Sequence, residues 1–232
     1  MGIFETVKAF SLKDKQSLIE HLKSFITKER FNKMVEVLNW RTYFITIVLE
    51  DIYQPQNASA TIRTCDCLGI QTIHTIENRN RFEVSRGVTL GADQWVDIHR
   101  HINKSPSLVA KQLKEKGYKI VATSPYATVS LNDFEITEPV ALLFGTEKDG
   151  LSEEAFATAD ITIKIPMYGF TTSYNISVSV AIMLYQLVHQ LHNSEFSWQL
   201  TPEQKTDLLL KWLVRDINNS ELIIEKFFSE KK

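Results

Sequence analysis

Short apolar runs alternate with longer segments of helical periodicity through most of the chain. Buried strands of a parallel sheet read as continuous apolar runs, whereas amphipathic helices repeat their apolar residues about every 3.6 positions. The runs that fit strands are 43–50, 70–76, 95–99, 119–124, 140–145 and 161–165. Strands that alternate with helices predict an α/β fold with a mostly parallel sheet flanked by helices.

Helical periodicity also dominates both ends of the chain. Apolar residues recur at helical spacing over 11–26 and 27–38, and Thr201 followed by Pro202 begins another helix near the C-terminus. Inside the chain, helices are expected over 57–68, 105–116 and 175–191.

The composition is that of a soluble globular chain long enough for one main domain with appendages. Of the 232 residues, 44% are hydrophobic and 23% are charged. From the changes in periodicity we expect helical extensions over 1–41 and 195–232 around a central α/β domain over 42–194. Because no run of about 18 apolar residues and no N-terminal signal peptide is present, we expect a cytoplasmic protein without membrane contact.

The formal net charge of -2 gives no general signature of nucleic-acid binding, so a polyanion would have to be met by local patches. One such patch is a short segment with Arg79, Arg81 and Arg86. Cys65 and Cys67 are the only cysteines, and two thiols supply too few ligands for a zinc site. We expect both cysteines to be reduced.

Three polar loops follow predicted strands, and ligands of parallel α/β sheets bind at the carboxyl ends of the strands. The loops are QPQNASATIRTCD (54–66), GTEKDGLS (145–152) and PMYGFTTSYN (166–175). None of them contains G-x-G-x-x-G or G-x-x-x-x-G-K-[ST], so neither a dinucleotide fingerprint nor a P-loop is expected.

These loops overlap three blocks that resemble the signature motifs of the SPOUT superfamily of methyltransferases, in the branch that methylates ribose 2'-hydroxyls of RNA. The blocks are NASATIRTCDCLGI (57–70), LLFGTEKDGLS (142–152) and IPMYGFTTSYNISVSVA (165–181). With EDIYQPQN, GADQWVDIHRH and the helix around Trp212, the chain looks most similar to the tRNA (guanosine-2'-O-)-methyltransferases that act on guanosine 18 of the D-loop. The resemblance extends from about residue 28 to the C-terminus.

The resemblance implies a methyltransferase domain with a deep C-terminal trefoil knot, S-adenosylmethionine as the methyl donor, an obligate homodimer, and tRNA rather than DNA as the partner. Periodicity cannot show a knot, which general topology rules treat as a rare exception. No metal-binding cluster is visible in the sequence, and methyl transfer from a sulfonium needs none.

Cofactor contacts are implied for residues of several strand ends. They are Thr123, Gly145, Ile165, Met167 and Tyr174. The usual Ser-Leu-Asn of the family reads Ser-Tyr-Asn here, so Tyr174 places a phenol ring at an aliphatic position of the pocket. Gly169 would let the loop 166–175 approach a flat heterocycle closely. The alternative is a simple turn in which Asn175 caps the following helix.

Methyl transfer to a ribose requires the 2'-oxygen in line with the methyl group, and either removal of its proton or stabilisation of the developing alkoxide. The resemblance assigns this task to Arg63. A guanidinium group is normally a hydrogen-bond donor, so we favour Arg63 holding a phosphate and stabilising the alkoxide. Arg63 can act as a base only if the site strongly lowers the pKa of its guanidinium. The alternative is a helix-surface arginine in a salt bridge.

The other catalytic residues implied by the resemblance are Asn57, Glu147, Ser173 and Asn175. Asn57 is expected to begin the helix that carries Arg63, to cap it and to orient the arginine. Glu147 lies in a loop between glycines and is expected to hold Arg63 or Asn57, unless it is a solvated loop acid. Ser173 and Asn175 can hydrogen-bond ribose or phosphate.

Arg79, Arg81 and Arg86 alternate with Phe82, a pattern that suits phosphate contacts and stacking on RNA bases. A solvated charged loop is the alternative for this segment.

Two functions compete with methylation of a tRNA guanosine. A ribosomal RNA substrate is usual for relatives with a separate RNA-binding extension, and only about 27 residues precede the matching region here. A non-catalytic RNA-binding protein on the same fold is the second alternative. The presence of all the implied catalytic residues argues against it.

Overall fold

A parallel sheet carries the loops that the sequence singles out. The computed structural model describes residue 7 and residues 10–229. These residues fall into two units, one formed by Thr42–Trp198 and one by the described parts of Met1–Arg41 and Gln199–Lys232.

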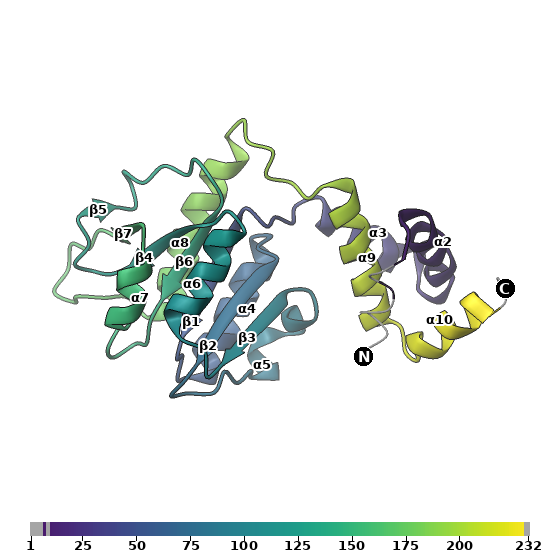
Figure 1. Cartoon of the computed structure of the whole chain (residues 1–232), viewed down its shortest axis with the longest axis horizontal. Helices are drawn as coiled ribbons and strands as arrows, with labels where there is room; N and C mark the ends of the chain where they lie inside the picture. The colour runs from purple at the N-terminus through teal and green to yellow at the C-terminus, as the bar shows by residue number, and fades with distance from the viewer. Residues whose placement is uncertain (1–6, 8–9, 230–232) are drawn as a thin grey trace. The chain divides into compact units, whose positions relative to one another are not determined.

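Within the described residues, Thr42–Trp198 forms a seven-stranded sheet in which every strand pair is parallel. The strands are β1 (Ile45–Glu50), β2 (Thr72–Glu77), β3 (Asp97–Ile102), β4 (Lys119–Thr123), β5 (Val129–Ser130), β6 (Val140–Phe144) and β7 (Ile161–Lys164). Their spatial order is β3-β2-β1-β6-β4-β7-β5 (Figure 1). This confirms the predicted parallel α/β sheet. The sequence did not indicate β5, because two residues carry no periodic signal.

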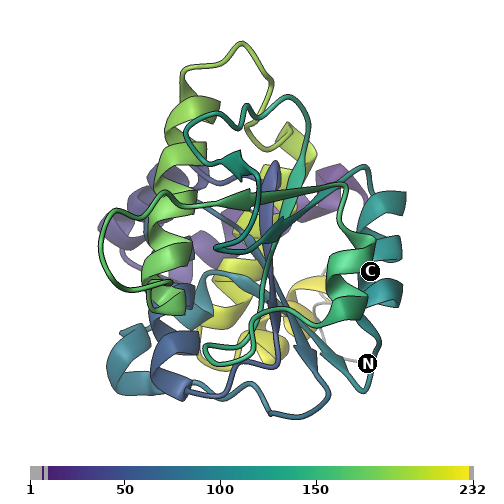
Figure 2. The same ribbon diagram turned by 90° about the vertical axis from the view of Figure 1, so that its left-hand side faces the viewer.

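Helices cover both faces of this sheet. They are α4 (Pro55–Cys67), α5 (Arg86–Thr89), α6 (Pro106–Glu115), α7 (Glu153–Thr158) and α8 (Ile176–His192), with the short 3-10 helix η2 (Ala92–Gln94). Figure 2 shows α8 on one side of the sheet and α6 with α7 on the other. Alternation along β1 explains these layers, because Ile47 and Leu49 share a core with residues of α4 and α8, whereas Val48 packs with residues of α6 and α7.

The strand order has a switch point between β1 and β6. The chain steps outward from β1 to β2 and β3, and then continues on the other side of β1 with β6, β4 and β7. Ile47 of β1 accordingly pairs with Ile73 of β2 and with Leu142 of β6. Such a point is where ligands bind in open α/β sheets, at the carboxyl ends of the strands.

Helix α4 begins two residues before the predicted position, so the predicted capping role of Asn57 is wrong. Gln54 is the N-cap residue and makes no capping hydrogen bond with its side chain, and Pro55 occupies the first turn. Proline fixes φ near the helical value, which allows the helix to begin there. Asn57 therefore lies inside the first turn, with its side chain available for other contacts.

The helices from both ends of the chain form the second unit. They are α2 (Leu12–Leu22), η1 (Lys23–Phe25), α3 (Lys28–Leu38), α9 (Pro202–Asp216) and α10 (Ser220–Ser229). Helix α9 packs against α2 and α3, and begins with a capping box of Thr201 and Gln204. The guanidinium of the buried Arg41 lies 5.3 Å from the ring centroid of Trp212. No helix of the described residues has both the length and the apolar character needed to cross a membrane.

Candidate active site

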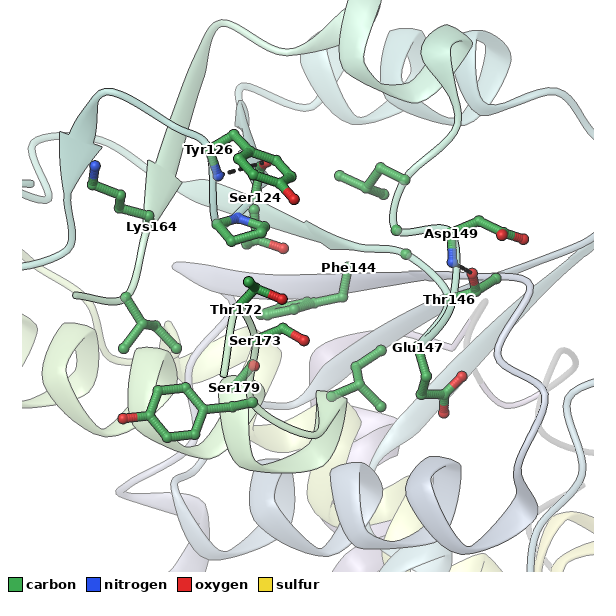
Figure 3. Close-up of a pocket in the computed structure, with 18 of the residues that line it drawn as sticks. Ser124, Tyr126, Phe144, Thr146, Glu147, Asp149, Lys164, Thr172, Ser173 and Ser179 are labelled. Atoms are coloured by element: carbon green, nitrogen blue, oxygen red, sulfur yellow. Dashed lines mark hydrogen bonds between the residues drawn. The ribbon is translucent and has the colours of Figure 1, made fainter. Parts of the chain in front are cut away.

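A cavity of about 300 Å³ opens at the carboxyl ends of β4, β6 and β7. The last residues of these strands, Thr123, Phe144 and Lys164, form part of its wall. The loops that follow the strands and the start of α8 complete it. Figure 3 shows the side chains of three loops around this space: Ser124 and Tyr126 after β4, Thr146 and Glu147 after β6, and Thr172 and Ser173 before α8.

All the residues predicted to contact a cofactor line this cavity. They are Thr123, Gly145, Ile165, Met167 and Tyr174. The hydroxyl of Thr123 is fixed by donating to the carbonyl of Leu143, with 2.8 Å between the oxygens. Tyr174 is 45% exposed, so its ring borders both the cavity and solvent. Cofactor binding by these residues stays a prediction.

The loop after β6 leaves no room for a side chain at Gly145. A Cβ atom there would overlap the backbone of Gly150 and Leu151. The loop closes on itself because the amides of Thr146 and Gly150 each donate to the other's carbonyl, at 2.9 and 3.0 Å. Gly150 has a φ of 72°, in the region that favours glycine. This closure brings main-chain atoms to the cavity wall.

The loop 166–175 differs, because the fold itself does not require glycine at Gly169. A Cβ atom there would meet no protein atom within 4 Å. At the end of the loop, Asn175 is the N-cap of α8, and its Oδ1 accepts from the amide of Ser177 at 2.9 Å. The cap at Asn175 that the alternative interpretation of this loop named is therefore present, and contact of Asn175 with RNA stays a prediction. Close approach of Gly169 to a ligand stays a prediction.

Asn175, Asn57 and Glu147 form a chain of hydrogen bonds at the edge of the cavity. The Nδ2 of Asn175 donates to Oδ1 of Asn57 at 3.1 Å, and Nδ2 of Asn57 donates to Oε1 of Glu147 at 2.6 Å. Asn57 is only 7% exposed, and a buried amide that both accepts and donates is fixed in orientation. Glu147 and the neighbouring Ser173 line the cavity directly. Asn57 therefore joins Glu147 to Asn175, and the three residues come from the three sequence blocks.

Arg63 lies apart from this chain of hydrogen bonds. Its side chain is exposed on α4 and does not belong to the cavity wall. Within the part of the chain that the structure describes, its guanidinium makes no hydrogen bond or ion pair, so the alternative of a helix-surface salt bridge is not realised. Glu147 holds Asn57 rather than Arg63. An exposed cation of this kind is available to an anionic ligand.

The segment between β2 and β3 exposes Arg79, Arg81 and Arg86. Arg79 already has protein partners, because its Nε lies 3.5 Å from Oδ2 of Asp51 and its Nη1 lies 3.6 Å from Oδ2 of Asp149. Both pairs are long and Arg79 is 58% exposed, so they are weak enough to exchange for a phosphate. RNA binding by the three arginines stays a prediction.

Phe82 anchors this segment, and the predicted stacking of its ring on RNA is wrong. The ring is 6% exposed and packs in the core, where an apolar side chain is more stable than in solvent. The amide of Phe82 donates to Oε2 of Glu77 at 3.1 Å. Burial acts to raise the pKa of Glu77, but hydrogen bonds from Arg100, the Phe82 amide and Thr75 hold this pKa below its usual value. Glu77 therefore stays ionised as an acceptor.

Several residues of the site were missed by sequence reasoning. Tyr126, which is 85% exposed, and Lys164 line the cavity. Lys164 ends β7 and Tyr126 lies in the loop after β4, so their positions at strand ends could have identified them from the sequence. Asp149, in the closed loop, also lines the cavity, and Asp51 is buried after β1 outside the cavity wall; neither carries a pattern that distinguishes it from ordinary loop acids.

Comparisons with known proteins agree with this geometry. Residues 44–185 match the SpoU rRNA Methylase family. The chain is 44% identical over 203 residues to the tRNA (guanosine(18)-2'-O)-methyltransferase of Borreliella burgdorferi, which covers 87% of this chain and 92% of that relative. It is 34% identical over 190 residues to the enzyme of the same name from Thermus thermophilus, covering 81% and 97%.

A solved structure supports the same relationship. The crystal structure of the A. aeolicus TrmH/SpoU tRNA modifying enzyme superposes with a TM-score of 0.73 at 30% sequence identity. The match covers 83% of this chain and 98% of that structure.

Proposed function

Because the chain belongs to the SpoU rRNA Methylase family, we propose that it transfers a methyl group from S-adenosylmethionine to the ribose 2'-hydroxyl of a tRNA guanosine, guanosine 18 of the D-loop. One observation carries the proposal. Asn57, Glu147 and Asn175 come from three separate blocks of the sequence and meet in one chain of hydrogen bonds at a cavity of about 300 Å³.

The cavity suits a nucleoside cofactor. Its volume is at the lower end of the range of roughly 300–1,000 Å³ that is usual for small-molecule sites. The closed loop at Gly145 offers main-chain donors and acceptors, Thr123 adds a hydroxyl, and Ile165 and Met167 add apolar surface. When bound, S-adenosylmethionine supplies an electrophilic methyl group. These residues and Tyr174 hold it in our proposal.

The polar residues at the cavity edge position the RNA side of the reaction. The hydrogen bond from Asn57 to Glu147 and that from Asn175 to Asn57 tie α4 to the two cavity loops. Helix α4 also carries Arg63, so these bonds fix the helix on which the arginine stands. In our proposal Arg63 holds a phosphate next to the target ribose and stabilises the developing alkoxide, because a guanidinium donates hydrogen bonds in a planar fork. Ser173 contacts the ribose.

The remaining expectations concern the partner and the assembly. Arg79, Arg81 and Arg86 contact tRNA phosphates, and the catalytic domain spans 42–194 between helical extensions over 1–41 and 195–232. The chain acts as a cytoplasmic homodimer with a trefoil knot in the C-terminal part of its sheet domain. Helix α8 supports a dimer, because Val178 and Tyr185 on it are 43% and 67% exposed.

Ribosomal RNA is the competing substrate within the family. The names of both sequence relatives given above favour tRNA. The matching of all five proposed catalytic residues and the intact hydrogen-bond chain disfavour a silent RNA-binding protein.

The test is a methyl-transfer assay with labelled S-adenosylmethionine and two RNAs, a full-length tRNA transcript and a ribosomal RNA fragment of similar length. We expect label in the tRNA alone. Label in the ribosomal fragment alone would contradict a tRNA substrate and favour ribosomal RNA instead. Failure of the protein to bind S-adenosylmethionine by calorimetry would remove the enzymatic function.

A further inference from the structure

A buried carboxylate organises the turn from which the arginine segment begins. Asp51 directly follows β1, is 4% exposed and has a φ of 51°. Its Oδ1 accepts from the backbone amides of Asn78, Arg79 and Asn80, at 2.7, 2.8 and 3.3 Å. The side chain of Asn80 donates back to the carbonyl of Asp51 at 2.8 Å. One residue thus fixes three consecutive peptide groups after β2.

The residue type suits this position. Among residues with a side chain, aspartate and asparagine adopt positive φ most readily. Hydrogen bonds from amides to an ionised carboxylate are about twice as strong as those between neutral groups. The backbone of Asp51 also donates to the carbonyl of Ile76 at 2.9 Å, which joins the ends of β1 and β2. The backbone of Asp51 is therefore held by β2 while its side chain holds the turn.

The far end of the arginine segment is attached to the helix that carries Arg63. The amide of Ser85 donates to Oγ of Ser59 at 2.7 Å, and Ser59 is fully buried on α4. Helix α5, which begins at Arg86, packs beside α4 (Figure 1). Asp51 at one end and Ser59 at the other thus hold the exposed arginines at fixed distances from α4.

We propose that Asp51 is a positioning residue for RNA binding. It holds the segment with Arg79, Arg81 and Arg86 in a fixed position relative to α4 and does not touch RNA itself. This rests on the proposed function. Several arginines bind a series of phosphates well only when their spacing is set in advance, because ordering a loose segment on binding costs conformational entropy. A carboxylate near phosphate contacts would otherwise weaken binding through repulsion, but this one is buried and satisfied by amides.

Two variants separate this role from that of a surface charge. Asp51→Ala removes the acceptor for three amides, whereas Asp51→Asn keeps an acceptor oxygen and tolerance of positive φ but loses the charge that faces Arg79. Asp160→Ala is the matched control. Asp160 also accepts a backbone amide, that of Ile120 at 2.8 Å, and pairs with Lys114 at 2.6 Å. It precedes β7, whereas Asp51 follows β1, so it lies at the opposite end of the parallel strands.

The measurements are kcat and KM for tRNA, the Kd of S-adenosylmethionine, and hydrogen exchange of the amides from Asn78 to Arg86. For Asp51→Ala we expect KM for tRNA to rise roughly tenfold or more, from the loss of hydrogen bonds to a charged group. The Kd of the cofactor and kcat should change by less than about twofold. Hydrogen exchange should accelerate in the segment alone. Asp51→Asn should bring both KM and exchange most of the way back to the wild-type values. Asp160→Ala should leave KM unchanged.

Unchanged KM and unchanged exchange in Asp51→Ala would overturn the proposal. So would equal losses of cofactor affinity and tRNA affinity, or exchange that accelerates across the whole sheet, because both indicate general structural support. If Asp51→Asn behaves like Asp51→Ala, the negative charge of Asp51 facing Arg79 matters and positioning by its acceptor oxygen does not, which would also overturn the proposal. Wild-type protein that methylates no tRNA would refute the proposed function instead, while the exchange data would still report on the turn.

Discussion

Arg63 is the residue on which the proposed chemistry depends. Arg63→Ala should reduce the single-turnover rate on saturating tRNA by on the order of 100-fold or more, as removal of a transition-state donor does elsewhere. Calorimetry should show nearly unchanged affinity for S-adenosylmethionine, because Arg63 lies outside the cavity wall. Lys111→Ala, which removes an exposed cation from α6, is the matched control and should retain activity.

Arg63→Lys then divides the two mechanisms left open by the sequence. Lysine keeps the charge but loses the planar fork, so an electrostatic role predicts a severe loss that alkaline pH relieves only in part. Strong recovery as the pH approaches about 10.4 would indicate a base instead. Near-normal rates in Arg63→Ala would make Arg63 a structural residue of α4.

Gly145 is a second residue whose role follows from geometry. Gly145→Ala places a methyl group into the backbone of Gly150 and Leu151, so the free energy of unfolding should fall by roughly 2 kcal/mol or more in urea titrations. Gly169→Ala is the comparison, because no protein atom lies near its Cβ position. It should keep wild-type stability and lose cofactor affinity. A Gly145→Ala protein of wild-type stability would contradict the closed loop.

At the scale of elements, particular strands and helices show how much of the fold could be predicted from the sequence. The continuous apolar run of β1 and the cap at Asn175 were readable, because burial on both faces and N-cap chemistry leave local signals. The start of α4 was misread, since Pro55 extends the helix past the polar residue that looked like a cap. Phe82 was misread because a single aromatic among arginines does not reveal which side it faces.

The cavity could be predicted only in part for a similar reason. Its loops were identifiable from the strand ends, but contacts such as those of Asn57 with Glu147 and Asn175 join residues far apart in the chain. Their geometry depends on the strand order around β1 and β6. No local pattern encodes that order.

A histidine cluster on β2 and β3 predicts a pH dependence of stability. The ring of His74 stacks on those of His99 and His101, with centroids 4.9 and 5.3 Å apart. Burial, followed by the charges of His99 and His101, lowers the pKa of His74 to about 3. Between about pH 6.5, the unfolded value, and that pKa, the unfolded chain binds a proton that the folded protein does not. The free energy of unfolding should therefore decrease as the pH falls, by at most about 1.4 kcal/mol per unit for this group.

Urea unfolding between about pH 4 and pH 6.5 measures this slope. His74→Gln should flatten it, whereas His189→Gln, a change of an exposed histidine on α8, should leave it as in the wild type. An equal slope in His74→Gln would mean that His74 is protonated in the folded protein over this range.

At the scale of the whole molecule, the prediction concerns assembly. Val178 and Tyr185 lie seven positions apart on α8 and are 43% and 67% exposed, so we expect a second copy of the chain to cover them. Light scattering at micromolar concentration should give the mass of a dimer for the wild type and of a monomer for Tyr185→Glu. Leu108→Glu, a change of a 39% exposed leucine on α6, should remain a dimer. A fully active wild-type monomer would contradict the proposed assembly.

The measurement that bears most directly on the central claim compares two tRNA transcripts that differ by one oxygen atom. The first carries guanosine at position 18, and the second carries 2'-deoxyguanosine there. With labelled S-adenosylmethionine, we predict transfer of one methyl group to the first transcript, mapped to the ribose of guanosine 18, and no transfer to the second. Equal labelling of both transcripts would contradict methylation of that 2'-hydroxyl.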